Sequence, residues 1–127
     1  MIFVDTSAFV ALRSPADPNH KKAHEVAFQL EKREDSLITT NYILAETYTV
    51  ISQKVSKDRL IAFGEEFDPR IKLISIDEDL EGAAWKIFKG IKSKNVSYCT
   101  SFAVMRYYNI DQSFAFDEDF EKFVIGS

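Results

Sequence analysis

The chain has 127 residues, of which 46% are hydrophobic and 28% charged, and its formal net charge is −4. This length suits one domain with a buried core, and we expect residues 1–127 to form a single unit. The acidic balance argues against non-specific nucleic-acid binding through a broad basic surface. A single cysteine, Cys99, excludes an internal disulfide, and no apolar run is long enough to span a membrane. Because no basic segment precedes the first apolar run, we expect a cytoplasmic protein without a signal peptide.

Short apolar runs mark the expected strands. Four of them lie at residues 2–4, 37–39, 73–76 and 114–116, and a weaker fifth lies at 123–125. The runs are continuous rather than alternating, which is typical of strands that are buried on both faces of a parallel sheet.

Segments with helical spacing of apolar residues separate these strands. The first begins at Thr6 and the second follows Pro18, and further helices are expected at residues 41–55, 56–67, 79–92 and 99–109. Strands that alternate with helices predict an α/β fold in which helices cover both faces of a parallel sheet. Ligands of such folds bind outside the carboxyl ends of the strands.

Three acidic residues are expected near that edge of the sheet. Asp5 and Asp117 each come directly after an expected strand, the first and the fourth, and Glu46 lies near the second turn of the helix that follows the second strand. Carboxylates gathered at one edge repel one another and raise one another's pKa. A hard divalent cation, Mg²⁺ or Mn²⁺, relieves this repulsion and activates a water molecule for attack on a phosphodiester.

Each acid also has a purely structural interpretation. Asp5 suits the cap of the helix that follows it, Asp117 suits the turn that follows it, and Glu46 suits an ion pair with a lysine. Their common edge is what favours a metal site. For Asp5, capping and catalysis are compatible.

Other candidate residues are interpreted as structural. His20 and His24 are four residues apart, but no carboxylate follows at the spacing of a metalloprotease, so a surface role is expected. Cys99 in an apolar helix is expected to be a core residue. A phosphatase with an aspartyl nucleophile also places an Asp after its first strand, but it needs a second Asp two residues on, where this chain has Ser7.

Residues suited to binding at the surface also have structural interpretations. The lysines at 86, 89, 92 and 94 are typical of a solvated helix face. Trp85, Phe88, Tyr107 and Tyr108 suit stacking on RNA bases, although aromatic residues at helical spacing are typical of a core or an interface.

Four stretches together resemble the PIN-domain family, and most closely its VapC-type toxins. They are VDTSAFVAL with Asp5, YILAETYTV with Glu46, CTSFAVMRYY, and SFAFDEDF with Asp117. The resemblance implies a three-layer α/β/α sandwich with a central parallel sheet, and a Mg²⁺- or Mn²⁺-dependent endoribonuclease of a toxin–antitoxin pair. It also implies an RNA substrate, a VapB-like antitoxin and a second copy of the chain as partners.

Carried over residue by residue, the resemblance assigns the site. Asp5, Glu46 and Asp117 match the family's metal-binding acids. Accessory positions are the small hydroxyl residues after the first acid and near the head of the later helix, and one weaker acid: Thr6, Ser7, Thr100, Ser101 and Asp119.

One family position departs from the pattern. The family usually has an aspartate just before the cysteine of CTSFA, where this chain has Tyr98 in an alignment without a gap. A two-residue deletion is an alternative alignment, and the acid is absent in both. The nearby Asn95 and Ser97 are neutral and weaker ligands, and a phenol with a pKa of about 10 is a poor ligand or base.

Two explanations of Tyr98 stay open. The domain has lost cleavage naturally while keeping its fold and partner binding, or the substitution was selected because an active toxin harms its expression host. The alternative function is therefore an inactive PIN domain that binds RNA or an antitoxin. Such an antitoxin is expected to lay its C-terminal segment across the acidic groove and to offer Arg or Lys to Glu46 and Asp117.

Overall fold

The computed structural model describes residues 1–92 and 95–117, so the strand expected at 123–125 lies outside the described residues. Within this part, one sheet contains four strands in the order β3-β2-β1-β4, and every neighbouring pair is parallel. Their bounds are β1 (Ile2–Val4), β2 (Leu37–Thr40), β3 (Lys72–Ile74) and β4 (Gln112–Phe114).

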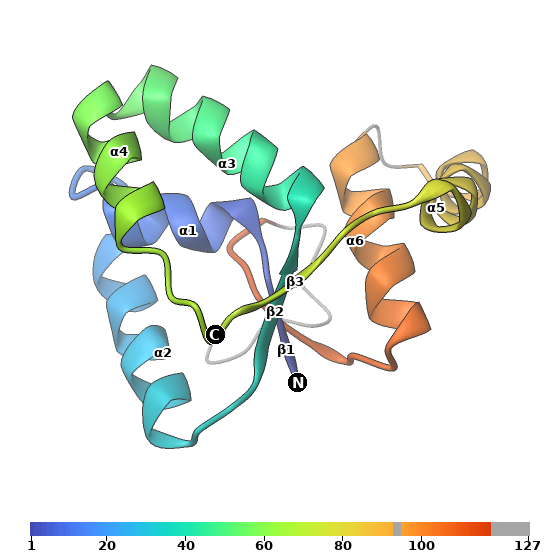
Figure 1. The fold of residues 1–127 in the computed structure, drawn as a ribbon, viewed down its shortest axis with the longest axis horizontal. Coiled ribbons are helices and arrows are strands. Elements are labelled where there is room, and N and C mark those ends of the chain that lie inside the picture. Colours follow the sequence, from blue (N-terminus) through green and yellow to red (C-terminus); the bar gives the residue numbers. More distant parts are fainter. Residues whose placement is uncertain (93–94, 118–127) are drawn as a thin grey trace.

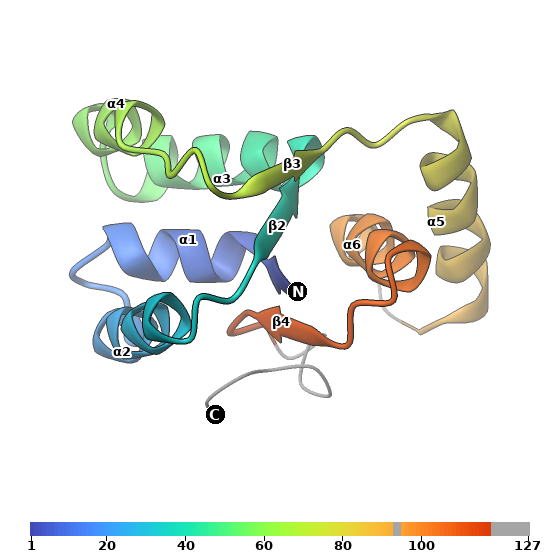
Figure 2. The same ribbon diagram turned by 60° about the horizontal axis from the view of Figure 1, so that its bottom comes forward.

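Helices cover both faces of this sheet. Figures 1 and 2 show α1, α2 and α4 on one side of the strands, and α5 and α6 on the other. The bounds of the helices are α1 (Thr6–Arg13), α2 (His20–Lys32), α3 (Asn41–Lys54), α4 (Lys57–Glu65), α5 (Glu78–Gly90) and α6 (Val96–Tyr107). The expected α/β fold, with helices on both faces of a parallel sheet, is confirmed.

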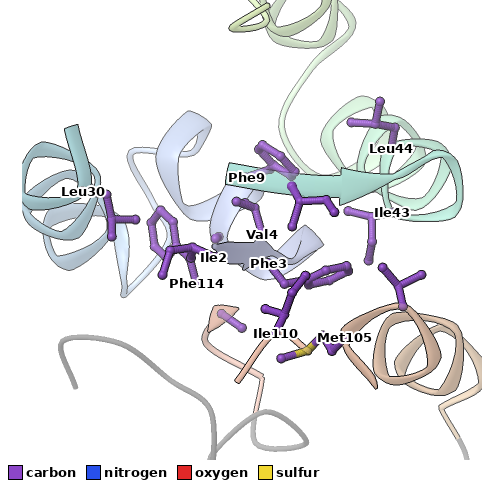
Figure 3. Close-up of a cluster of buried hydrophobic side chains, with 14 of the residues drawn as sticks. Ile2, Phe3, Val4, Phe9, Leu30, Ile43, Leu44, Met105, Ile110 and Phe114 are labelled. Carbon is purple, nitrogen blue, oxygen red and sulfur yellow. The ribbon is translucent and has the colours of Figure 1, made fainter. Parts of the chain in front are cut away.

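The core is organised around β1, which pairs with β2 on one side and β4 on the other. Side chains alternate across the sheet. In Figure 3, Ile2 and Val4 point toward the layer that contributes Leu30, whereas Phe3 points toward Met105 of α6. All five side chains are buried. The end of β1 is thereby fixed from both faces, and so is the residue that follows it.

Capping side chains set the starts of the helices, as expected for Asp5. Asp5, Thr40 and Asp77 are the N-caps of α1, α3 and α5, and each accepts a hydrogen bond from a backbone N–H of the first turn. The start of α6 differs from the prediction of residue 99. Asn95 caps the helix and accepts from the N–H of Tyr98, so the helix begins at Val96.

Two strand boundaries also differ from the prediction. β4 lies at Gln112–Phe114 rather than 114–116, because its register pairs Phe114 with Val4 at the end of β1. β3 ends at Ile74, and the N–H of Ile76 instead donates to the side-chain oxygen of Asn41 at 2.8 Å. That bond ties the exit of β3 to the start of α3.

Candidate functional site

Asp5 lies at the carboxyl edge of the sheet, directly after β1. Its backbone N–H donates to the carbonyl of Phe114 in β4 at 3.1 Å. Its Oδ2 accepts from the backbone N–H of Ser7 at 3.0 Å and from the Ser7 hydroxyl at 2.6 Å. The residue is only 7% exposed. Capping of α1 by Asp5 is confirmed, and the cap leaves a carboxylate almost removed from water.

The charge of Asp5 is therefore costly in this position. Burial raises the pKa of its carboxyl above the usual 3.8, the two hydrogen bonds from Ser7 lower it, and the neighbouring charges of Glu46 and Asp117 raise it further. Negative charges thus converge on Asp5 from two other parts of the chain, as the sequence predicts.

Glu46 projects from the second turn of α3 and is half-buried. Its Oε2 accepts a hydrogen bond from the hydroxyl of Ser97 in the first turn of α6, at 2.5 Å. Figure 1 shows the start of α3 close to α6. Among the described residues, Glu46 thus contacts Ser97 rather than a lysine, which was the structural alternative for this residue. Sequence reasoning had set Ser97 aside as a weak ligand and missed this contact.

Asp117 comes three residues after the end of β4, not directly after the strand, and is half-buried. Between them, the backbone N–H of Phe116 donates to the Ser7 hydroxyl oxygen at 2.9 Å. Ser7 therefore links the segment that leads to Asp117 with the carboxylate of Asp5. The accessory candidate Asp119 lies outside the described residues.

The other hydroxyl candidates behave differently from Ser7. Thr6 donates to the carbonyl of Ile43 at 3.3 Å, and Thr47 donates to the Thr6 hydroxyl at 3.2 Å, so this pair joins α1 to α3. Thr100 donates to the carbonyl of Ser97 at 2.7 Å. Ser101 is fully buried, and its hydroxyl has no hydrogen-bond partner among the described residues. Thr6 and Thr100 therefore contact backbone groups near the acids.

Tyr98 packs into the helical layer. Its ring stacks on Phe102, with ring centroids 5.6 Å apart, and the half-buried side chain packs against the core cluster of Ala84, Cys99 and Ala103. The position where the family usually has an acid is thus a packing position in this chain.

Ser7 gives the first testable prediction. In Ser7→Ala, Asp5 loses its shortest hydrogen bond and the N–H of Phe116 loses its acceptor, so RNA cleavage is expected to fall about 10- to 100-fold. Steady-state cleavage assays measure this loss. Ser52→Ala, which removes an exposed hydroxyl in α3, is the control and should cleave normally. Equal activity of Ser7→Ala and wild type would contradict the role of Ser7.

The remaining candidates lie away from the acids. The ring nitrogens of His20 and His24 contact the carbonyl oxygens of Ala11 and Leu12 in the last turn of α1, at 2.7 and 3.1 Å. The imidazoles therefore form hydrogen bonds with carbonyl groups at the end of that helix. Cys99 is a core residue, as expected.

Two of the aromatic side chains are exposed. Trp85 is 60% and Tyr107 72% exposed, so neither is a core residue. Within residues 1–92 and 95–117, no helix has the length and apolar character to cross a membrane.

Two cavities also lie elsewhere. One of about 720 Å³ is lined by α1, α2 and α4, including Phe9, Leu30 and Phe67. The other, of about 600 Å³, lies between α5, α6 and the exit of β3 and includes Asp77 and Arg106. Neither is lined by Asp5, Glu46 or Asp117.

The donor set at the edge suits a hard divalent cation, since Asp5, Glu46 and Asp117 offer only carboxylate oxygens. Among the described residues, however, no three His, Cys, Asp or Glu side chains are placed to hold an ion together. Mg²⁺ commonly binds through one or two carboxylates and keeps several waters. The residues therefore fit a cation bound largely through water.

A comparison with protein-family models matches residues 2–125 to the PIN domain. The chain belongs to the PIN-domain family. In two strains of Mycobacterium tuberculosis, CDC 1551 and H37Rv, the 23S rRNA-specific endonuclease VapC20 is 31% identical over 123 residues, covering 94% of this chain and 92% of VapC20.

The solved structures include a relative with the same fold. A crystal structure of M. tuberculosis VapC20, described as a sarcin–ricin loop cleaving toxin, matches this PIN domain with a TM-score of 0.84 at 30% identity. The match covers 95% of this chain and 93% of that chain. The PIN fold and the VapC-type toxin ribonuclease expected from the sequence are confirmed. The roles of the individual site residues stay predictions.

Proposed function

We propose that residues 1–127 form a single PIN domain. This domain hydrolyses RNA phosphodiesters with the help of Mg²⁺ or Mn²⁺ held at Asp5, Glu46 and Asp117. The observation that carries the proposal is the buried carboxylate of Asp5, whose pKa is raised by burial and by the charges of Glu46 and Asp117. A cation at this edge would offset the negative charge of the carboxylates and favour the charged form of Asp5.

The side chains at this edge of the sheet have different proposed roles. Asp5 holds the cation from the end of β1, and Ser7 fixes the orientation of its carboxylate by donating to Oδ2. Glu46 and Asp117 approach from α3 and from the segment after β4. When bound, the cation supplies a Lewis acid and a water molecule of lowered pKa for attack on the phosphodiester.

The relatives suggest the substrate and partners. VapC20 is named for cleavage of 23S rRNA, and we propose ribosomal RNA as the substrate class here. We further propose a VapB-like antitoxin that offers Arg or Lys to Glu46 and Asp117, a second copy of the chain as dimer partner, and action in the cytoplasm, where ribosomes lie.

Cleavage of purified 23S rRNA with Mn²⁺ or Mg²⁺ tests the proposal. We expect discrete fragments with either cation, none in the presence of a chelator, and at least a hundredfold slower cutting by Asp117→Asn. Asp111→Asn, which alters an exposed acid before β4, should cut as wild type does. Cleavage that persists in the chelator, or in Asp117→Asn, would contradict the metal and the site.

The packing of Tyr98 favours a second candidate function, a PIN domain that binds its antitoxin without cutting RNA. This alternative predicts tight antitoxin binding and no metal-dependent cleavage. Cleavage by the wild-type chain that is abolished in Asp5→Ala would exclude it.

A further inference from the structure

We infer that Ser97, the residue before the position at which the family usually has an aspartate, is a positioning residue for Glu46. The inference deepens the proposed function and rests on it for the role of Glu46. It names a residue that sequence reasoning set aside.

The geometry of the contact is specific. Ser97 Oγ lies 2.5 Å from Glu46 Oε2, a distance typical of a hydroxyl that donates to a charged carboxylate. The two residues are 51 positions apart, so the bond spans from α6 to α3. With one carboxylate oxygen engaged by Ser97, the rotation of the Glu46 carboxylate is restricted.

The first turn of α6 is itself held in place. Asn95 accepts from the N–H of Tyr98 at 3.2 Å, and Thr100 donates to the carbonyl of Ser97 at 2.7 Å. Ser97 is thus bound through its side chain to Glu46 and through its carbonyl to Thr100. The hydroxyl of Thr100, one of the accessory residues expected from the sequence, therefore helps to hold Ser97 in position.

The neighbouring residue, Tyr98, packs into the helical layer. Tyr98 directs its ring onto Phe102 and into the cluster around Ala84 and Cys99. On a helix, adjacent residues point in directions that differ by about 100°, so the side chains of Ser97 and Tyr98 lie on different faces of α6. Ser97, in the first turn of α6, thus reaches an acid of the site.

A neutral hydroxyl changes the charge of the site. The charges of Glu46 and Asp117 already act on the buried carboxylate of Asp5. A fourth carboxylate at the start of α6 would increase this repulsion, whereas the hydroxyl of Ser97 does not. The hydroxyl still orients Glu46 but adds no charge. We therefore expect weaker metal binding than a four-acid site gives, together with better stability of the metal-free protein.

Mn²⁺ affinity, measured by calorimetry on the full chain without RNA, tests the inference independently of cleavage. Ser97→Ala should weaken Mn²⁺ binding about 10- to 100-fold, and Ser97→Thr, which keeps the hydroxyl, should restore it. In a Glu46→Ala background, Ser97→Ala should have no further effect on Mn²⁺ affinity, because the carboxylate that accepts from Ser97 is already gone. Ser52→Ala is the matched control.

Kinetics and stability separate positioning from a structural role. Ser97→Ala should lower kcat for RNA with little change in KM, and should lower the melting temperature by about 3–5 °C. Ser97→Asp should bind Mn²⁺ more tightly than wild type and melt lower than wild type without metal. If Ser97→Ala fails to fold, the Ser97→Thr and Ser97→Asp pair decides.

The outcomes are distinct. Unchanged Mn²⁺ affinity in Ser97→Ala, or additive losses in the Glu46→Ala background, would overturn the inference even if the melting temperature falls. If wild type does not cut RNA but Ser97→Ala still weakens Mn²⁺ binding, the inference holds and the proposed nuclease function fails.

Discussion

Replacing Asp5 with asparagine is expected to remove RNA cleavage and to raise the melting temperature of the metal-free protein. Asparagine keeps the capping oxygen that accepts from Ser7 and has a similar capping preference, so α1 should begin as before. It removes a buried charge that lies near Glu46 and Asp117. We expect a loss in cleavage of more than about a hundredfold, because even outer partners of a metal ligand account for 10- to 100-fold.

The gain in stability should depend on pH in a defined direction. The pKa of Asp5 is raised in the folded protein, so between the usual 3.8 and the raised value the folded state binds more protons than the unfolded state. Stability from this group therefore falls as pH rises through that window. The advantage of Asp5→Asn should be largest at pH values above the raised pKa and should disappear near pH 3.8.

Thermal melts of both proteins over this pH range, with chelator present, measure the difference. Asp111→Asn changes an exposed acid and should show no comparable gain. Saturating Mn²⁺ should stabilise wild type and leave Asp5→Asn nearly unaffected. A lower melting temperature for Asp5→Asn at neutral pH would show that the Asp5 charge stabilises the fold, against this account.

Replacing Phe3 with alanine is expected to give the largest loss of stability, about 3–5 kcal/mol in the free energy of unfolding. Phe3 is 0% exposed in β1, between β2 and β4, and its ring fills the side of the sheet that α6 covers. A loss of this size is a large share of the 5–15 kcal/mol typical of a domain. Urea unfolding followed by circular dichroism measures it.

Phe28→Ala is the matched control, because Phe28 is 63% exposed on α2, where the Lys32 ammonium lies 5.4 Å from the centre of its ring. Its loss should stay below about 1 kcal/mol. Equal losses in the two variants would mean that the face of β1 toward α6 is not a principal part of the core.

The position of the acids was predictable because it depends on chain order and strand direction. Asp5 follows β1 whatever the packing, and parallel pairing then brings the ends of the four strands to one edge. The N-cap Asp5 was predictable for a similar reason, since a cap acts within the first turn of its own helix.

The contact between Ser97 and Glu46 was not predictable from the sequence. It requires the separation and rotation of α3 relative to α6, which are set by side-chain packing between segments 51 residues apart. The start of α6 was misplaced by three residues because Val96 and Ser97 carry no strong helical pattern, and the Asn95 cap decides the boundary. With the helix predicted to begin at residue 99, Ser97 is placed in the preceding loop.

The most direct test of the central claim is Mn²⁺-dependent cleavage of RNA by this chain beside its Tyr98→Asp variant, with Asp5→Ala as the control. We expect the wild-type chain to cut and Asp5→Ala to be inactive, which would show that Asp5, Glu46 and Asp117 suffice and that Tyr98 is a tolerated packing residue. Cleavage by Tyr98→Asp alone would contradict this, because it would show that the site needs the aspartate that this chain lacks.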